Sequence, residues 1–312
     1  MTDTGPLFVS SGDLIADRRY HAAMDLASRG DLSAAADVLA QTVSTAPGFA
    51  AAWFALGAIR GRLGDRQGAV AAFTEASRSD PEDYHGARLQ LAQLGAGDSV
   101  PAMTESYLRR LFDQYAARYD TALTEQLHYR GPAILCETVK SALHGLRRPM
   151  QFDALLDLGC GTGLAGAACR RFAAHLVGVD LSPAMVARAQ AKELYDRLVV
   201  GNFAAFLADE IENGAKYDLV LAADVFVYVN DLTEIIADIA RVLAAAGIFA
   251  FTVETHSGAG VALLPTLRFA FGEPYLRDAV AAGGLKLLKL EKTVIRTEKT
   301  APVQGMVLVA SA

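Results

Sequence analysis

The most informative stretch of this 312-residue sequence is Leu156-Asp157-Leu158-Gly159-Cys160-Gly161-Thr162-Gly163. An apolar run with strand character leads into three glycines, which permit a sharp backbone turn and the close approach of a ligand. A helical stretch, 164–173, follows the turn. Strand, glycine turn and helix in this order predict a parallel-sheet unit with a ligand site at the carboxyl end of the strand.

Apolar runs alternate with helical stretches from residue 151 onward, as in a parallel sheet joined by crossover helices. The expected strands are 154–158, 176–180, 197–200, 218–222, 247–254, 285–294 and 304–310. The expected helices are 164–173, 183–194, 203–213, 231–244 and 275–282. We therefore expect an α/β fold for this part of the chain.

Two acidic residues bear on the choice of cofactor. Asp180 ends the second expected strand, where a carboxylate can accept both hydroxyls of a ribose, so a cofactor that contains a nucleoside is predicted. Residues 161–166, Gly-Thr-Gly-Leu-Ala-Gly, also fit the Gly-x-Gly-x-x-Gly pattern of nicotinamide and flavin enzymes. Asp157, however, would repel the pyrophosphate of a dinucleotide. It would attract the ammonium and sulfonium groups of S-adenosylmethionine (SAM), which is therefore the favoured cofactor.

The string Asp-Leu-Gly-Cys-Gly-Thr-Gly at 157–163, with Asp180 after the next strand, resembles the first two motifs of class I SAM-dependent methyltransferases. The resemblance implies a seven-stranded Rossmann-like sheet whose last two strands form an antiparallel hairpin within 285–310. It also implies that S-adenosylhomocysteine is the product. A dehydrogenase would need a further substrate domain, and no segment is left over for one.

The same resemblance assigns further cofactor contacts. Asn202 stands where the family usually has an aspartate that contacts the adenine, and an amide can both accept and donate there. A helix N-cap is the alternative role for Asn202, and a core position is the alternative for Met185. The full set of implied contacts is Asp157, Gly159, Cys160, Gly161, Gly163, Asp180, Leu181, Met185, Asn202, Phe203, Ala223 and Asp224.

The first third of the chain contains an internal repeat with a period of 34 residues. Gly30-Asp31 aligns with Gly64-Asp65, and Pro47 aligns with Pro81. The pattern resembles tetratricopeptide repeats and predicts two helical hairpins over 13–94, with a closing helix from about Glu82. Because two repeats are few for a free-standing groove, the helices are expected to pack on the catalytic domain or on a second subunit. A docking surface for another protein is the alternative.

The segment Phe112-Asp113-x-Tyr115-Ala116-x-x-Tyr119-Asp120 resembles the stretch before the core in small-molecule methyltransferases of the ubiquinone-biosynthesis type. With Tyr129-Arg130 it also resembles bacterial predicted methyltransferases that carry N-terminal tetratricopeptide repeats. The resemblance implies that Tyr115, Tyr119 and Arg130 cover the methionine end of SAM, with Arg130 pairing its carboxylate. A core stripe for the aromatics, and an ordinary surface role for Arg130, are the alternatives.

Three domains are expected: tetratricopeptide-like helical repeats at 1–98, a helical linker and lid at 99–150, and a SAM-binding methyltransferase domain at 151–312. Methyl transfer needs a general base only if the acceptor must lose a proton. The candidate bases are His256, just after the fifth strand, and Tyr228, after the fourth. Arg268 and Tyr275 are candidates to line a pocket for an anionic acceptor.

Composition and charge restrict the partners. The formal net charge of −6 and the lack of a basic arm argue against nucleic acid. The residues Ala223-Asp224-Val225-Phe226 also lack the proline pair that adenine-N6 and cytosine-N4 DNA methyltransferases have at this site. The apolar runs 219–229 and 242–253 are too short to span a membrane. None of the three cysteines sits in a Cys-x-x-Cys pair, so no metal site is predicted. The first residues lack the basic start and apolar run of a signal peptide, which predicts a cytoplasmic location.

A small-molecule acceptor is the leading expectation for the reaction. A protein acceptor recruited by the repeats and a non-catalytic SAM-binding scaffold are the alternatives. Self-association through the helical repeats is a further expectation.

Overall fold

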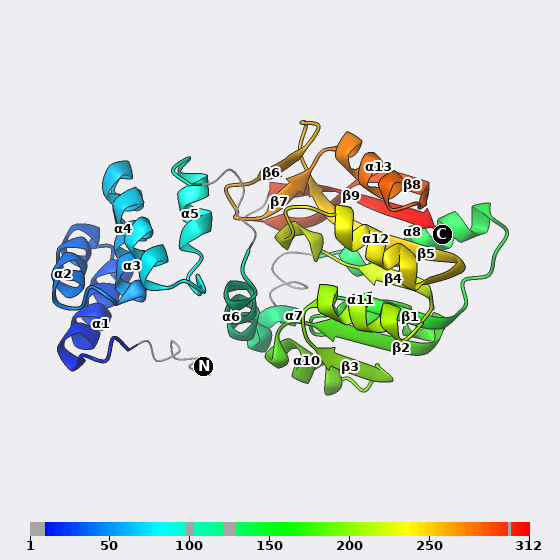
Figure 1. Ribbon diagram of the computed structural model, residues 1–312, viewed down its shortest axis with the longest axis horizontal. Helices are drawn as coiled ribbons and strands as arrows, with labels where there is room; N and C mark the ends of the chain where they lie inside the picture. Colours follow the sequence, from blue (N-terminus) through cyan, green and yellow to red (C-terminus); the bar gives the residue numbers. More distant parts are fainter. Residues whose placement is uncertain (1–9, 98–102, 122–128, 299–300) are drawn as a thin grey trace. The chain divides into compact units, whose positions relative to one another are not determined.

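The computed structural model describes residues 10–97, 103–121, 129–298 and 301–312 (Figure 1). The chain divides into two compact units, Met1–Tyr107 and Leu108–Ala312. The domain boundaries predicted at residues 98 and 150 remain predictions.

The first unit is helical. Its helices are α1 (Leu14–Ser28), α2 (Leu32–Thr45), α3 (Ala50–Arg62), α4 (Arg66–Ser79) and α5 (Ala87–Gln93). Helix α1 packs on α2 and α3 packs on α4, so two helical hairpins follow one another, as expected. The two turns repeat the same chemistry: Gly30 and Gly64 have positive φ angles of 87° and 82°. Asp31 and Asp65 then cap the following helix, each accepting from a backbone N–H three residues later.

Small residues allow the helices of the second hairpin to approach closely. A Cβ atom on Gly57 of α3 would lie 2.8 Å from the ring of Phe73 on α4, so only glycine fits at this crossing. The two aligned prolines also have the same place in the structure, because α2 and α4 end two residues before Pro47 and Pro81. The closing helix begins at Ala87 rather than near Glu82. Asp83 adopts a φ of 51° and its carboxylate accepts from the Ala87 N–H, which delays the start of the helix.

The second unit is built on a mixed β-sheet. Its strands are β1 (Phe152–Leu158), β2 (Ala173–Asp180), β3 (Arg197–Val200), β4 (Tyr217–Ala222), β5 (Leu243–Thr255), β6 (Val261–Leu263), β7 (Phe269–Phe271), β8 (Lys286–Glu298) and β9 (Ala301–Ser311). Strands β3, β2, β1, β4 and β5 run parallel in that order. Strand β9 is antiparallel to β5 and pairs with β8, so the expected Rossmann-like sheet with a terminal hairpin is confirmed.

Nine strands are present among the described residues where seven were predicted. The two additional strands, β6 and β7, form a small hairpin at the carboxyl end of β5. Each has only three residues, which is too short for an alternating pattern to be recognised in a sequence. The hairpin places its connecting segment, which contains Arg268, above the edge of the sheet where the parallel strands end.

Helices cover both faces of the sheet. The helices of this unit are the larger part of α6 (Glu105–Tyr115), and α7 (Tyr119–Thr121), α8 (Gly131–Gly145), α9 (Leu164–Cys169), α10 (Pro183–Gln190), α11 (Phe203–Glu212), α12 (Thr233–Val242) and α13 (Glu273–Ala282). Helix α8 packs its apolar side on one face, where Leu135 and Val139 meet Leu155, Leu219 and Ile248. Helices α11 and α12 lie over the opposite face (Figure 1). The sheet is thus buried, and its ligand-facing edge is left to the loops.

Candidate active site

The glycine turn after β1 is held against the end of β2. Gly159, Gly161 and Gly163 have φ angles of 63°, 54° and 90°, a backbone region that favours glycine. The N–H of Gly161 donates to Oδ2 of Asp180 at 2.8 Å. The turn borders a cavity that is lined by Tyr119, Tyr129, Pro132, Gly159, Cys160, Gly161, Thr162, Leu164, Ala165 and Ala223.

The three glycines of the turn meet different neighbours. A Cβ on Gly161 would meet only the Tyr119 ring, at 3.9 Å, so this position is open toward the cavity. A Cβ on Gly159 would lie 2.5 Å from Val225, and one on Gly163 would lie 3.0 Å from the ring of Tyr195. Sequence reasoning assigned all three to ligand approach. The structure shows that Gly159 and Gly163 also make room for side chains of the protein itself.

Asp157 lies at the end of β1, buried below the turn with 1% of its surface exposed. The hydroxyl of Tyr195 donates to its Oδ2 at 2.6 Å. Its Oδ1 has no hydrogen-bond partner among the described residues. Burial raises the pKa of the Asp157 carboxyl to about 7, and the hydrogen bond from Tyr195 opposes that rise. A buried carboxylate oxygen of this kind is suited to a cationic ligand group.

Asp180 is the second carboxylate beside the turn. Its Oδ2 accepts from Gly161 and its Oδ1 accepts from the N–H of Ser182 at 2.9 Å. Burial raises the pKa of this carboxyl, and the two backbone donors oppose the shift. Each carboxylate oxygen has two lone pairs, so Asp180 retains the capacity to accept further donors.

Two acidic residues upstream of the sheet reach the same place. The hydroxyl of Ser182 donates to Asp113 of α6 at 2.5 Å. The hydroxyl of Thr162 donates to Asp120 of α7, which also pairs with Lys192 at 2.7 Å. These contacts tie the segment 112–120 to the glycine turn and to the start of α10. The sequence pattern contained both acids, but reasoning from it selected the aromatics instead.

The predicted residues of that segment separate in the structure. Tyr119 is half-buried and lines the cavity, whereas Tyr115 is 41% exposed and stacks under Arg118. Tyr129, which was not selected, lines the cavity. Arg130, its neighbour, is exposed and lines a separate groove between α8 and β8.

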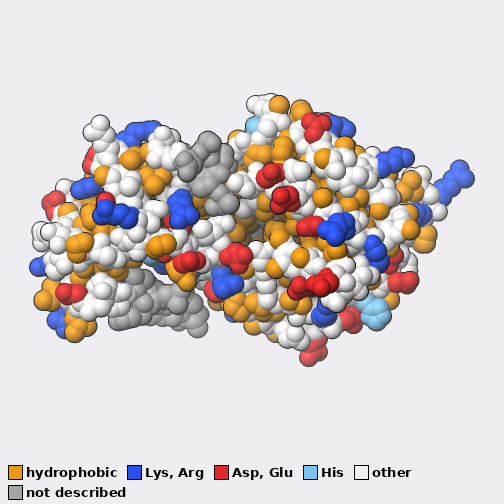
Figure 2. Space-filling view, in the orientation of Figure 1, with side chains coloured by type: hydrophobic (Ala, Val, Ile, Leu, Met, Phe, Trp, Pro, Cys, Tyr) orange, Lys and Arg blue, Asp and Glu red, His pale blue; other side chains and the backbone are white. Residues whose placement is uncertain are grey.

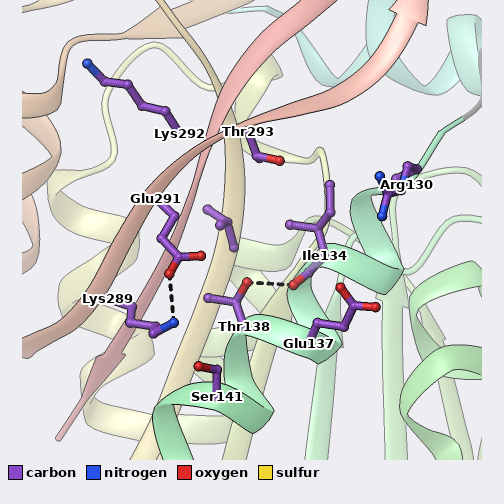
Figure 3. Close-up of a pocket in the computed structure, with 10 residues that line it drawn as sticks. Arg130, Ile134, Glu137, Thr138, Ser141, Lys289, Glu291, Lys292 and Thr293 are labelled. Atoms are coloured by element: carbon purple, nitrogen blue, oxygen red, sulfur yellow. Dashed lines mark hydrogen bonds and ion pairs between the residues drawn. The ribbon is translucent and has the colours of Figure 1, made fainter.

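Figure 3 shows this separate groove. Arg130 lies at the start of α8, above Glu137 and Ser141 on the same helix, and β8 forms the facing wall. Lys289 and Glu291 on β8 pair with each other at 2.7 Å. Arg130 is thus placed outside the cavity at the glycine turn, and its predicted pairing with SAM stays a prediction.

The residues assigned to the adenine lie at the ends of β2 and β3. The N–H of Gly201 donates to the carbonyl of Asp180 at 2.9 Å, which brings the two strand ends together. The side-chain oxygen of Asn202 caps α11 by accepting from the N–H of Ala204 at 2.7 Å, and the side-chain nitrogen takes no part in that cap. Met185 is 1% exposed, and Leu181 and Phe203 are half-buried. Their contacts with an adenine remain predictions.

A buried ionic cluster lies beyond β4, next to the predicted Asp224. Arg296 of β8 is 1% exposed and pairs with Asp224 at 3.1 Å and, more closely, with Glu254. Arg268 lies 3.5 Å from Glu254 and 3.5 Å from Glu298. Ala223 precedes this cluster and borders the cavity. Glu254 and Arg296 were missed. Glu254 is the lone charge of the apolar strand β5, a signal that could have marked it, whereas Arg296 is one of several charges in β8 and carries no such signal.

Tyr228 belongs to the short helix η4 (Phe226–Tyr228) beside the same cluster. Its ring makes an edge contact with Phe112, the centroids lying 5.1 Å apart. Burial raises the pKa of its phenol, and the nearby Arg268 partly offsets that rise. Tyr275 was a candidate, together with Arg268, to line a pocket for an anionic acceptor. Its hydroxyl instead donates to Asp231 at 2.8 Å.

His256 follows β5 in a loop that satisfies both nitrogens of its ring. The N–H of Gly258 donates to Nδ1 at 3.0 Å, and Nε2 lies 2.9 Å from the carbonyl of Gly260. Because Nδ1 accepts, Nε2 must carry the proton and donate. A base role for His256 would require this arrangement to open, and that role stays a prediction.

Residues 156–251 match the model of a family described as a methyltransferase domain. The match covers the glycine turn, the carboxylates of Asp157 and Asp180, and the end of β4. The chain therefore contains a methyltransferase domain, as the sequence predicted.

Curated relatives match the same region. Methyltransferase-like protein 27 of Homo sapiens is 35% identical over 108 residues, covering 34% of this chain and 42% of that protein. Ubiquinone biosynthesis O-methyltransferase of Rhodopseudomonas palustris (strain BisB5) is 30% identical over 108 residues, covering 35% of this chain and 40% of that protein. The chain thus spans about two fifths of the length of these relatives.

Among solved structures, the 1,6-didemethyltoxoflavin-N1-methyltransferase of Burkholderia thailandensis aligns with a TM-score of 0.49 at 21% identity. It covers 69% of this chain and 92% of its own. A SAM-dependent methyltransferase of Clostridium acetobutylicum aligns with a TM-score of 0.46 at 17% identity, covering 64% of this chain and 98% of its own.

Within the described residues, no helix is both long and apolar enough to cross a membrane. The same residues hold no group of three or more histidine, cysteine or acidic side chains suited to a metal ion. On the face that Figure 2 draws, acidic and basic side chains are interspersed.

Proposed function

We propose that this protein transfers a methyl group from SAM to a small-molecule acceptor. One observation carries the proposal: in a segment that matches a methyltransferase domain, a buried carboxylate with a free oxygen lies beside an open glycine turn. A dinucleotide would bring its anionic pyrophosphate to the same turn, next to Asp157 and Asp180, which favours SAM.

The residues present fit this cofactor. The free Oδ1 of Asp157 is suited to the ammonium group, and the remaining lone pairs of Asp180 are suited to the ribose hydroxyls. Tyr119, Tyr129 and Gly161 border the space between them. When bound, SAM supplies a methyl group that its sulfonium already activates.

The chain's own contribution is chiefly positioning. Asp113 and Asp120 fasten the segment 112–120 over the turn, so that Tyr119 covers the cavity and excludes water. Tyr228, Arg268 and the Asp224–Arg296 pair lie where an acceptor would enter, beyond the end of β4. Tyr228 and His256 remain the candidates for a base if the acceptor loses a proton.

The test is a calorimetric titration of the full chain with S-adenosylhomocysteine, with NADH and NADP as controls. Binding of S-adenosylhomocysteine alone supports the proposal. If a nicotinamide nucleotide binds instead, Asp157 has been misinterpreted. If the folded protein binds none of the three, the proposal is wrong.

Replacing His256 by alanine separates a base from a loop residue. If His256 is a base, turnover should fall about 10²-fold or more while the affinity for S-adenosylhomocysteine is kept. If it only orders its loop, turnover should stay within about twofold of the parent. Turnover and affinity measured on the same preparations, once an acceptor has been found, decide between the two outcomes.

A protein acceptor recruited by the helices is the second candidate function. The repeated Gly-Asp turns and the close α3–α4 crossing at Gly57 support the tetratricopeptide interpretation of the first unit. Retention of the fold as a non-catalytic SAM-binding scaffold is a third candidate. The three free thiols fit the cytoplasmic location that we also propose.

Deleting residues 1–95 tests whether the helices serve the cofactor site. Every residue of the site described above lies in the second unit, so the shortened chain should bind S-adenosylhomocysteine within about threefold of the full chain. Loss of a protein partner with binding retained would favour recruitment. A shortened chain that fails to fold would show that the helices are part of the core.

A further inference from the structure

The ring of Tyr195 occupies a slot made by three glycines. Tyr195 lies in the loop between α10 and β3. A Cβ added to Gly163 would lie 3.0 Å from its ring, and one added to Gly178 would lie 2.7 Å away. A Cβ on Gly166 would overlap its hydroxyl still more closely. Two of these glycines, at 163 and 166, belong to the Gly-x-Gly-x-x-Gly pattern, so two of its three glycines accommodate a side chain of the protein.

The loop that carries Tyr195 is anchored independently of the glycine turn. The carboxylate of Asp196 accepts from the N–H of Leu176 at 2.7 Å, and its own N–H donates to the carbonyl of Leu176 at 2.9 Å. Arg170 pairs with the same carboxylate at 3.1 Å. The position of the Tyr195 ring is therefore set by β2, before any ligand binds.

The hydroxyl of Tyr195 is aimed at the carboxylate of Asp157. It donates to Oδ2 at 2.6 Å, a length typical of a hydrogen bond to an ionised oxygen. Burial raises the pKa of the Tyr195 phenol, so the hydroxyl stays protonated and remains a donor. The bond occupies one carboxylate oxygen and leaves Oδ1, the one without a partner, for a ligand.

We propose that Tyr195 is a positioning residue that favours the ionised form of the buried Asp157 and presents its second oxygen to the ammonium group of the cofactor. The inference rests on the proposed function for the identity of that cofactor. The inference adds Tyr195 to the cofactor site. It also explains Gly163 and Gly166, which make room for the Tyr195 ring, whereas the sequence motif by itself assigns them to ligand approach.

The other groups around Asp157 set the background against which Tyr195 acts. Asp180 opposes ionisation of Asp157 through its charge, whereas the backbone N–H of Gly166 favours it. The remaining neighbours are kept neutral: burial raises the pKa of Cys160 and of Tyr129, and the hydrogen bond with Cys136 together with burial raises the pKa of Cys169. Tyr195 is thus the one side chain in this group that favours the charged form of Asp157.

The sign of the pH dependence follows from the pKa of about 7. An ammonium group pairs with the carboxylate, so below about pH 7 binding must first remove a proton from Asp157. The affinity for S-adenosylhomocysteine should then fall by up to tenfold for each pH unit. Without the Tyr195 hydroxyl the carboxyl is harder to ionise, and the midpoint of this acid-side fall should move upward.

The experiment measures binding of S-adenosylhomocysteine to full-length Tyr195→Phe between pH 5.5 and 8.5 by calorimetry. We expect the acid-side midpoint to rise by about one pH unit. Binding should be about fivefold weaker than in the parent at pH 7 and within about twofold at pH 8.5. The ammonium group of free S-adenosylhomocysteine titrates identically in every experiment, so a difference in midpoint between two variants comes from the protein.

Tyr217→Phe is the matched control. Tyr217 is also a buried tyrosine that donates to a carboxylate, that of Glu210, but at the opposite end of the parallel strands. Its removal should leave the midpoint unchanged. Asp157→Asn should abolish the acid-side fall, and adding Tyr195→Phe to it should change the profile no further.

A measurement without ligand keeps the inference separate from the proposed function. The raised pKa makes folding less favourable as the pH increases from 3.8 to about 7, relative to Asp157→Asn, with no further change above that range. In the Tyr195→Phe background this levelling should occur about one unit higher. A parent that shows the levelling but binds no S-adenosylhomocysteine would overturn the proposed function alone.

Two results would overturn the inference. One is an unchanged midpoint in both the binding and the unfolding profiles of Tyr195→Phe. The other is an equal loss of affinity at every pH, which would make Tyr195 a filler of the glycine slot and nothing more.

Discussion

Replacing Arg296 by methionine is expected to lower the free energy of unfolding by about 3–5 kcal/mol. Arg296 is 1% exposed, and its guanidinium pairs with both Asp224 and Glu254. Methionine has a similar volume but no charge, so it would leave Asp224 without this cation and Glu254 with only the more distant Arg268, at 3.5 Å. The cost is that of stranding charges rather than that of losing apolar contacts.

Chemical denaturation measures this effect. Adding Glu254→Gln to the methionine variant should recover part of the loss. Arg241→Met is the matched control, because that arginine pairs with Asp238 at 3.3 Å but is 62% exposed. Its effect should be below about 1 kcal/mol. A deficit for Arg296 no larger than that would contradict the prediction.

Replacing Asp180 by alanine is expected to weaken binding of S-adenosylhomocysteine at least tenfold, about 1.4 kcal/mol. The substitution removes the proposed acceptor of the ribose hydroxyls. It also frees the N–H of Gly161 from its bond at 2.8 Å, so the glycine turn loses one of its hydrogen bonds to β2 and keeps the one from Cys160 to Val179. Calorimetric titration of the folded variant gives the ratio of dissociation constants.

Asp218 provides the control for this substitution. Its carboxylate also accepts two backbone N–H groups, those of Asp153 at 2.8 Å and Ala154 at 3.0 Å. These bonds lie at the amino ends of the strands, opposite the glycine turn. Asp218→Ala should therefore leave the affinity unchanged. Equal weakening by both alanine variants, or by neither, would contradict the assignment of Asp180 to the ribose.

The upstream segment shows how far sequence reasoning reached. The string from Phe112 to Asp120 was expected to cover the cofactor, and the structure does tie it to the glycine turn. The ties are made by Asp113 and Asp120, whereas Tyr115 is 41% exposed and does not line the cavity. A helical stripe identifies residues that share a face, but it does not tell which face meets another element. That choice depends on partners such as Ser182 and Thr162, which are far away in the chain.

The strands show a similar limit of sequence reasoning: the long strands of the terminal hairpin were predicted, and the short strands of the β6–β7 hairpin were not. The seven longer strands carry enough apolar residues to be recognised, and all seven are present near their predicted positions. The three-residue strands β6 and β7 carry too few apolar residues to be recognised, and they form because β7 pairs with the end of β5. They nevertheless matter for function, since they hold Arg268 beside Tyr228 and Glu254.

The sequence alone determined the sheet, the helical first unit and the place of the glycine turn. Those features depend on residues that are neighbours in the chain, such as the glycines after β1 and the Gly-Asp turns 34 residues apart. The tertiary structure alone decided that Tyr195 fills the glycine slot and that Arg296 neutralises Asp224. These contacts join distant segments, and they arise only when β2, β4 and β8 are aligned in one sheet. Burial then shifts the pKa values of the ionisable groups that these contacts bring together, and the pattern of neighbouring residues does not give the extent of that burial.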